Sequence, residues 1–279
     1  MIRLQNMEEG GTPATEERTL RIAASSYLNT APLIWSFTHG TRQGTVELIE
    51  ALPAHCAGLL QERKVEAALV PVIEYQRIAD IALIPDVCVG SREWVRSVVL
   101  VTKVEDLREI RRIALDESSR TSAALLKIIF REFLGCEPEW VTGKPDVGQM
   151  LADHDAALII GDPAMTFARD NLRVFDLAAL WREHTGLGFV FAMWMVRDEA
   201  PAARRIDFAE ARDEGLALTE DIIEFYEPLL GLSRDELRTY LRENISFSID
   251  EEMRAGMELY FKLAQRHGII PAVKALKFR

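Results

Sequence analysis

The feature that most constrains the fold is an alternation of short apolar runs with helix-forming segments between residue 20 and about residue 196. Apolar runs typical of buried strands are found at 20–24, 46–51, 65–72, 81–89, 94–102, 112–115, 156–160, 172–177 and 189–196. Helical patterns separate several of these runs, as at 53–64 and 121–134. Strands separated by helices of about ten residues predict an α/β protein with mostly parallel, helix-covered β-structure.

The C-terminal third of the chain has almost no strand pattern. It predicts three amphipathic helices, near 201–228, 233–243 and 249–267. Ser233, with Glu236 three residues later, forms a capping box at the start of the second helix. Such helices must bury their apolar faces against structure that other parts of the chain have formed.

This arrangement predicts two lobes with a cleft between them. Lobe one would comprise residues 20–103 and 197–279, and lobe two residues 104–196, so that the chain crosses between the lobes twice. A single nine-stranded sheet with trailing helices is the alternative. Residues 1–19 are polar and contain two adjacent glycines, and we expect them to form a flexible N-terminal tail.

Composition excludes several classes of protein. Of the 279 residues, 48% are hydrophobic and 28% charged, as is usual for a soluble globular protein, and the net charge of −11 disfavours nonspecific binding to nucleic acid or anionic membranes. The three cysteines are too few for a disulfide framework or a zinc cage. The N-terminal segment lacks the features of a secretory signal, and every apolar run is shorter than the roughly 20 residues of a membrane span. We therefore expect a cytoplasmic protein.

The sequence lacks the common patterns of metal, nucleotide and covalent catalysis. Its five histidines occur singly, with none of the i, i+4 pairs that bind a metal from one helix face. No Gly-x-Ser-x-Gly elbow, phosphate-binding loop or dinucleotide fingerprint is present. We expect neither a metal nor an organic cofactor.

Three polar segments follow predicted strands, where open α/β sheets bind their ligands. SSYLNTAPL (25–33) supplies neutral donors, and DESSRTSAALL (116–126) combines hydroxyls, free helix amides and a guanidinium into an anion site. GDPAM (161–165) is the third segment, in which the aspartate could cap the next helix. The predicted substrate-binding residues are Ser26, Tyr27, Ser119, Arg120, Thr121, Ser122, Gly161 and Asp162. A capped strand-to-helix turn without a ligand is the alternative for each segment.

Ser97 is a separate candidate, because it interrupts the otherwise apolar run 94–102 near the first predicted crossover between lobes. A serine can also occupy a strand without function by bonding its own backbone neighbours.

These segments, taken in order, resemble a known family. SYLNTAPLIW, PVIEY, IPDVCVG, RSVVLVT, SSRTSAALL, LIIGDPAM and LWREHTGLGFVFAMW lie between residues 20 and 196 and resemble chorismate dehydratase, the first enzyme of the futalosine route to menaquinone. The resemblance implies a two-lobed type-II periplasmic-binding-protein-like fold with a central cleft, used as a cytoplasmic enzyme. It implies that the protein removes water from chorismate to give 3-[(1-carboxyvinyl)oxy]benzoate.

The resemblance also implies the catalytic residues. The family's functional asparagine falls on Asn29 and its functional serine on Ser97, and the substrate's own enolpyruvyl carboxylate is implied as the base. The sister enzyme 1,4-dihydroxy-6-naphthoate synthase is one alternative, but a protein base such as histidine is expected there and none of the three polar segments contains one. A cytoplasmic binding protein for a small carboxylate is the other alternative. The sequence permits, without requiring, a homodimer.

Overall fold

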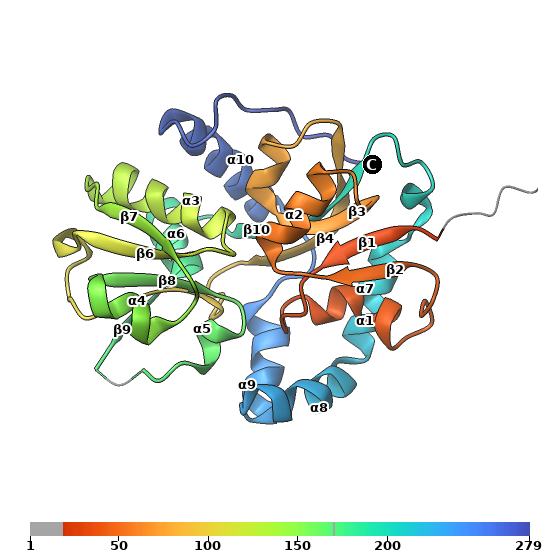
Figure 1. Cartoon of the computed structure of the whole chain (residues 1–279), viewed down its shortest axis with the longest axis horizontal. Coiled ribbons are helices and arrows are strands. Elements are labelled where there is room, and N and C mark those ends of the chain that lie inside the picture. Colours follow the sequence, from red (N-terminus) through yellow and green to blue (C-terminus); the bar gives the residue numbers. More distant parts are fainter. Residues whose placement is uncertain (1–18, 170) are drawn as a thin grey trace, which may run out of the picture.

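Two five-stranded sheets form the frame of the protein (Figure 1). The computed structural model describes residues 19–169 and 171–279, so the tail predicted over 1–19 lies, except for Thr19, outside the described residues. Sheet A has the order β2 (Glu47–Glu50), β1 (Arg21–Ala24), β3 (Ala67–Pro71), β10 (Phe189–Arg197) and β4 (Ile81–Ser91). Sheet B has the order β7 (Glu139–Gly143), β6 (Arg112–Asp116), β8 (Ala156–Ile160), β5 (Val98–Thr102) and β9 (Arg173–Asp176). We call sheet A with its helices lobe one and sheet B with its helices lobe two.

The two sheets share one plan of strand directions. In sheet A, β1 runs parallel to β2 and β3, whereas β10 runs antiparallel to β3 and β4. In sheet B, β6 runs parallel to β7 and β8, whereas β5 runs antiparallel to β8 and β9. The antiparallel strand in each sheet is the one by which the chain enters that sheet from the other lobe.

Helices cover both sheets. In lobe one, α2 (Pro53–Gln61) lies on one side of sheet A, and α1 (Ala31–Thr38) packs with α7 (Phe208–Ala217) on the other (Figure 1). The helices of lobe two are α3 (Thr121–Ile128), continued by the π-helix η3 (Ile129–Leu134), then α4 (Val147–Asp153), α5 (Pro163–Thr166) and α6 (Leu177–Thr185). The remaining helices are the 3-10 turns η1 (Val72–Gln76), η2 (Leu107–Glu109) and η4 (Ala203–Arg205), then α8 (Thr219–Leu230), α9 (Arg234–Thr239), its π-helical continuation η5 (Tyr240–Asn244), and α10 (Glu251–Arg266).

The structure corrects two strand assignments. The strand within 94–102 was predicted in lobe one and the strand at 189–196 in lobe two, but β5 belongs to sheet B and β10 to sheet A. Both segments are almost wholly buried, and a buried apolar strand fits either sheet equally well, so the local pattern could not assign them. The alternative of a single nine-stranded sheet is wrong.

Other boundaries also differ. The strand β7 was not predicted, because it lies at the edge of sheet B and is half-exposed, with no continuous apolar run. The single helix expected over 201–228 is two helices, α7 and α8, that meet at Leu218. The capping box of Ser233 and Glu236 is present at the start of α9.

One hydrophobic cluster runs through both lobes and places the ends of several strands against one another. Helix α10 packs on β10 of lobe one and on α3 of lobe two, and so ties the lobes together. As a result the carboxyl ends of β1, β6 and β8 and the start of β5 meet between the sheets.

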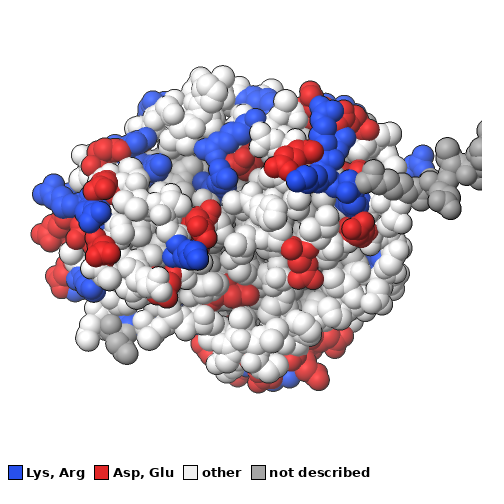
Figure 2. Space-filling view, in the orientation of Figure 1, with Lys and Arg blue, Asp and Glu red and all other residues white. Residues whose placement is uncertain are grey.

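Charged side chains lie mostly toward the edges of the face shown in Figure 2, with acidic and basic residues interspersed. On that face the described chain has no continuous basic surface. No helix among the described residues is long and apolar enough to cross a membrane.

Candidate active site

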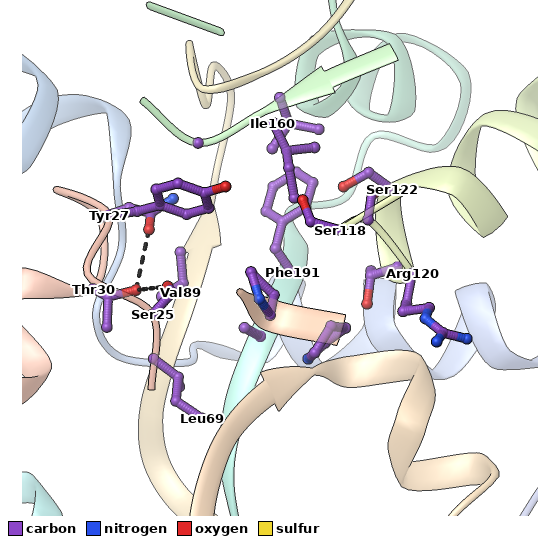
Figure 3. Close-up of a pocket in the computed structure, with 18 residues that line it drawn as sticks. Ser25, Tyr27, Thr30, Leu69, Val89, Ser118, Arg120, Ser122, Ile160 and Phe191 are labelled. Carbon is purple, nitrogen blue, oxygen red and sulfur yellow. Dashed lines mark hydrogen bonds between the residues drawn. The ribbon is translucent and has the colours of Figure 1, made fainter. Parts of the chain in front are cut away.

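A pocket opens between the two sheets (Figure 3). The lining residues from lobe one are Ser25, Tyr27, Asn29, Thr30, Pro53, Leu69, Pro71, Val89, Phe191 and Ala192, and those from lobe two are Val98, Ser118, Ser119, Arg120, Thr121, Ser122, Ile160 and Gly161. Aliphatic and aromatic side chains form one part of the wall, and hydroxyls, one amide and one phenol form the rest. Arg120 is the only charged residue among those that line the pocket in the described chain.

The loop after β1 presents Asn29 to the pocket in a defined orientation. Thr30 Oγ1 donates a hydrogen bond to Asn29 Oδ1 at 3.3 Å, and Ser25 Oγ lies 2.9 Å from Thr30 Oγ1 (Figure 3). Since the Thr30 proton is directed at Asn29, Ser25 is the donor in the second bond. The carbonyl of the Asn29 amide is therefore occupied, and its NH2 group is left to donate.

The turn after β6 is built around a buried carboxylate. Asp116 is 1% exposed and accepts hydrogen bonds from Ser118 N (2.8 Å), Ser118 Oγ (2.7 Å) and Ile160 N (3.3 Å). Burial raises the pKa of Asp116, and the hydrogen bonds from Ser118 and Ile160 act in the opposite direction. The carboxylate fixes the turn from behind, because it is not itself part of the pocket wall.

Tyr27 reaches across the pocket to this turn. Its hydroxyl interacts with the side chain of Ser118, and burial raises the pKa of Tyr27 to about 12. A phenol with such a pKa stays protonated near neutral pH and is a poor base. Tyr27 therefore places a neutral phenol hydroxyl between the two walls of the pocket.

The N-terminus of α3 supplies the most polar part of the wall. Ser119 and Ser122 are buried there, and Ser119 Oγ has no hydrogen-bond partner within residues 19–169 and 171–279. Thr121 is tied to other elements, since its Oγ1 accepts from Ile73 N at 3.3 Å and its carbonyl accepts from the Tyr260 hydroxyl at 3.0 Å. An eight-residue helix whose first turn carries hydroxyls and free amides attracts a carboxylate.

Arg120 lies at the edge of the predicted anion site and not inside it. Its side chain is exposed, and Figure 3 shows the guanidinium extending away from the other labelled residues. No acidic side chain of the described chain forms an ion pair with it. Arg120 is thus an unpaired cation at the rim of the pocket.

Ser97 lies in a strained turn directly before β5, and not within the strand as predicted. Ser97 N donates to Val95 O at 2.6 Å across Arg96, whose φ is 61°, which makes a γ-turn. The Asp176 carboxylate holds this turn by accepting from Val95 N (3.0 Å) and Arg96 N (2.6 Å), and it also caps α6. Ser97 O in turn accepts from Gly161 N at 2.8 Å.

The Ser97 side chain is fully buried beside the pocket wall. Its hydroxyl has no hydrogen bond of good geometry to any described residue. The buried hydroxyl of Tyr240 lies close to the side chains of both Ser97 and Asn29, and it too has no hydrogen bond of good geometry to a described residue. The structure thus brings together the two residues predicted to be catalytic.

Gly161 lines the pocket for a steric reason. Its φ is +69°, and a Cβ at this position would lie 2.6 Å from the ring of Tyr27. A glycine is required where the Tyr27 ring lies flat against the backbone of the other lobe.

Asp162 and Ser26 lie away from the pocket. The Asp162 carboxylate does not cap α5 as expected but accepts from Leu28 N at 3.0 Å, which links the lobes. Burial raises the pKa of Asp162 to about 6, against the effect of the Leu28 hydrogen bond. Ser26 and Asp162 border a second hollow next to α1 and α8, where the Ser26 carbonyl accepts from the Tyr226 hydroxyl at 2.7 Å.

Three residues of this region were missed by the sequence analysis. Asp176 could have been found, because an aspartate before a helical pattern is a typical N-cap. Asp116 was noted only as the first residue of its polar segment. Tyr240 carries no signal of its own, since it lies in a helical stretch without a polar loop.

The fold and the interlobe pocket define the class of protein: a two-lobed periplasmic-binding-protein-like fold. Solved structures agree. A protein of Archaeoglobus fulgidus superimposes with a TM-score of 0.77 at 19% identity, covering 92% of this chain and 100% of that chain. The periplasmic aliphatic sulphonate binding protein of Escherichia coli gives 0.61 at 17% identity, covering 95% of this chain and 97% of that chain.

Sequence comparison then identifies the family. A family model described as menaquinone biosynthesis matches residues 20–266. Chorismate dehydratase of Thermus thermophilus is 32% identical over 254 residues, which are 84% of this chain and 91% of that protein. Chorismate dehydratase of Campylobacter jejuni is 25% identical over 223 residues, 79% of this chain and 84% of that protein. The chain belongs to the menaquinone-biosynthesis family, and the resemblance found in the sequence is confirmed.

Proposed function

We propose that this protein is a chorismate dehydratase, a carbon–oxygen lyase of the cytoplasm that acts in the futalosine route to menaquinone. Besides family membership, the lining of the interlobe pocket supports the proposal. The interlobe pocket is lined by hydroxyls and a helix N-terminus, and its single charged residue is an arginine. Such a pocket suits a small molecule with two carboxylates, and chorismate is one.

The reaction removes the proton from C3 of chorismate and the hydroxyl from C4, and the two leave as water while the ring becomes aromatic. Loss of the proton spreads negative charge into the ring carboxylate, which the amides of α3 and the hydroxyls of Ser119 and Ser122 would stabilise. Arg120 would hold the same carboxylate or the second one from the rim. Asn29 and Ser97 would orient the reacting part of the ring.

The proton must go to a base, and the residues that line the pocket in the described chain include no side chain suited to that role. Neither a carboxylate nor a histidine lines the pocket in the described chain, and Tyr27 is held protonated by its raised pKa. This supports the substrate's own enolpyruvyl carboxylate as the base. The same argument disfavours 1,4-dihydroxy-6-naphthoate synthase, for which we expect a base supplied by the protein.

The test is to incubate the purified protein with chorismate, follow the ultraviolet spectrum and identify the product by mass spectrometry. We expect 3-[(1-carboxyvinyl)oxy]benzoate, lighter than chorismate by one water, and at least about tenfold less of it with Ser97→Ala at equal protein concentration over the same short time. Chorismate that is bound but recovered intact would instead indicate a binding protein for a small carboxylate. Chorismate that is neither bound nor changed would refute the assignment altogether.

A further inference from the structure

Tyr240 is a buried tyrosine next to the pocket with no role assigned so far. It is the first residue of η5, the π-helical continuation of α9, and is 1% exposed. Burial raises the pKa of its hydroxyl, while interactions with the side chains of Ser97 and Asn29 act to lower that pKa. Asn29 comes from lobe one, Ser97 from the start of sheet B and Tyr240 from the C-terminal helices, so three distant parts of the chain meet at one hydroxyl.

The hydrogen bonding at this point is incomplete. In the part of the chain that the structure describes, neither the Tyr240 hydroxyl nor Ser97 Oγ has a hydrogen bond of good geometry. Leaving two neighbouring buried hydroxyls without firm partners lowers the stability of a fold, so their presence calls for another explanation. A phenol can donate one hydrogen bond and accept another, which is enough to hold a serine hydroxyl and an amide at the same time.

The helix that carries Tyr240 is fastened to the turn that carries Ser97. Arg96, the neighbour of Ser97, forms an ion pair with Glu236 of α9, with Nη2 and Oε1 2.8 Å apart. The other oxygen of Glu236 accepts from Ser233 N at 3.1 Å in the capping box, so one carboxylate fixes both the helix start and the turn. The segment η5 that carries Tyr240 is π-helical, and π-helical segments within helices are frequent at functional sites.

We propose that Tyr240 is a positioning residue for the dehydration. When substrate is bound, the Tyr240 hydroxyl forms hydrogen bonds with the Asn29 amide and the Ser97 hydroxyl and holds them in the orientation in which they act. Tyr240 does not line the pocket, so it acts through these two side chains and not on the substrate itself. This role rests on the proposed function, which the assay of the wild-type protein tests separately.

The experiment replaces Tyr240 by phenylalanine, which removes the hydroxyl and keeps the buried ring. We expect kcat for chorismate to fall about 10- to 100-fold with KM within about threefold of wild type, because the loss affects orientation in the transition state. We expect Tm to be unchanged or higher, because the removed hydroxyl has no firm hydrogen bond to lose. A purely structural role predicts the reverse, a lower Tm with kcat retained.

Tyr75→Phe is the matched control. Tyr75 is as buried as Tyr240, but its hydroxyl donates to Ala275 O at 2.7 Å and accepts from Lys277 N at 2.9 Å, and it does not line the pocket. This variant should lower Tm and leave kcat unchanged. The contrast between the two phenylalanine variants separates loss of a hydroxyl in general from loss of this one.

A double variant tests whether Tyr240 acts through its neighbour. The combined decrease in kcat for Ser97→Ala with Tyr240→Phe should be smaller than the product of the two single decreases, because both changes disturb one contact. Decreases that multiply in full would overturn the proposal. So would wild-type kcat in Tyr240→Phe while the wild-type protein converts chorismate, and that result would leave the proposed function intact. A wild-type protein without dehydratase activity would overturn both.

Discussion

The two walls of the pocket are built in different ways. On the lobe-two side, the buried carboxylates of Asp116 and Asp176 each fasten a turn to neighbouring backbone of the same lobe. On the lobe-one side, the loop after β1 is held by its own hydroxyls and by contacts that reach the other lobe, from Tyr27 to Ser118 and from Leu28 to Asp162.

This difference indicates that the two walls have different roles, one in substrate binding and the other in the reaction step. The lobe-two wall keeps its shape through bonds within its own lobe, so it should bind substrate carboxylates in the ground state and the transition state alike. The lobe-one loop is held partly within its own lobe, by the Tyr226 hydroxyl on Ser26 O, and partly by contacts with lobe two. Because part of its support comes from the other lobe, Asn29 should act on the reaction step more than on binding. Four predictions test this comparison.

The largest effect should come from Asn29→Asp. The new carboxylate would face a dianionic substrate, and a like charge at ~4 Å costs about 4 kcal/mol at an effective dielectric constant of about 20, or about a thousandfold in kcat/KM. Asn29→Ala removes only a donor, which typically costs about 1–3 kcal/mol. Turnover and affinity of both variants should be measured from about pH 5 to about pH 8, a range in which an ordinary aspartate is ionised. If aspartate matches alanine at the upper pH, Asn29 does not face the substrate's charge.

The second prediction concerns Ser97→Ala. We expect kcat to fall by about 10- to 1,000-fold, because one oriented hydroxyl is lost from the reacting region. The fold should be as stable as wild type, since Ser97 Oγ has no firm hydrogen bond within the described residues. Steady-state kinetics and thermal unfolding are to be measured together. Wild-type turnover would show that the serine merely fills space at the start of β5.

The third prediction concerns Arg120→Ala. An unpaired cation at the rim should attract the substrate in every state, so we expect KM to rise about tenfold and kcat to change by less than about threefold. Raising the salt concentration should weaken binding to the wild-type protein more than to the variant. An unchanged KM, or a large loss of kcat with KM retained, would contradict the role of the lobe-two wall in ground-state binding.

The smallest effect should be on stability, from Asp162→Asn. The pKa of Asp162 is about 6 in the folded protein, against 3.8 for an ordinary aspartate, so the folded protein binds this proton more tightly than the unfolded chain. The contribution of this proton to stability is fully present below about pH 4 and is lost as the pH rises through about 6. Asparagine can still accept from Leu28 N through its Oδ1 and carries no charge.

Asp162→Asn should therefore have a Tm close to wild type near pH 4 and a higher Tm near pH 7.5. Thermal unfolding of both proteins across this range is the measurement. A variant that is less stable at the higher pH would mean that the charged carboxylate strengthens the contact between lobes.

Much of the fold could be predicted because burial leaves a local mark. Strands β3, β5 and β8 are buried along their whole length, and each is a short apolar run in the sequence. The edge strand β7 is half-exposed and left no such mark. The polar segments after β1 and β6 could also be recognised in the sequence, because hydroxyl residues directly follow an apolar run there.

The candidate site could be predicted only in part. Tyr27 and Gly161 line the pocket, yet their sequence neighbours Ser26 and Asp162 lie beside the second hollow. Successive residues after the end of a strand point in different directions. A polar segment therefore predicts where a site lies better than it predicts which residues line the site.

The sequence by itself determined which segments are strands and helices, where the polar loops fall and to which family the chain belongs. Only the tertiary structure decided which sheet receives β5 and β10, because an apolar strand is equally suited to any sheet that helices cover. It also decided that Asn29, Ser97 and Tyr240 lie close together. These residues are far apart in the chain, and contacts between distant residues depend on how whole elements pack, which no local pattern of residues encodes.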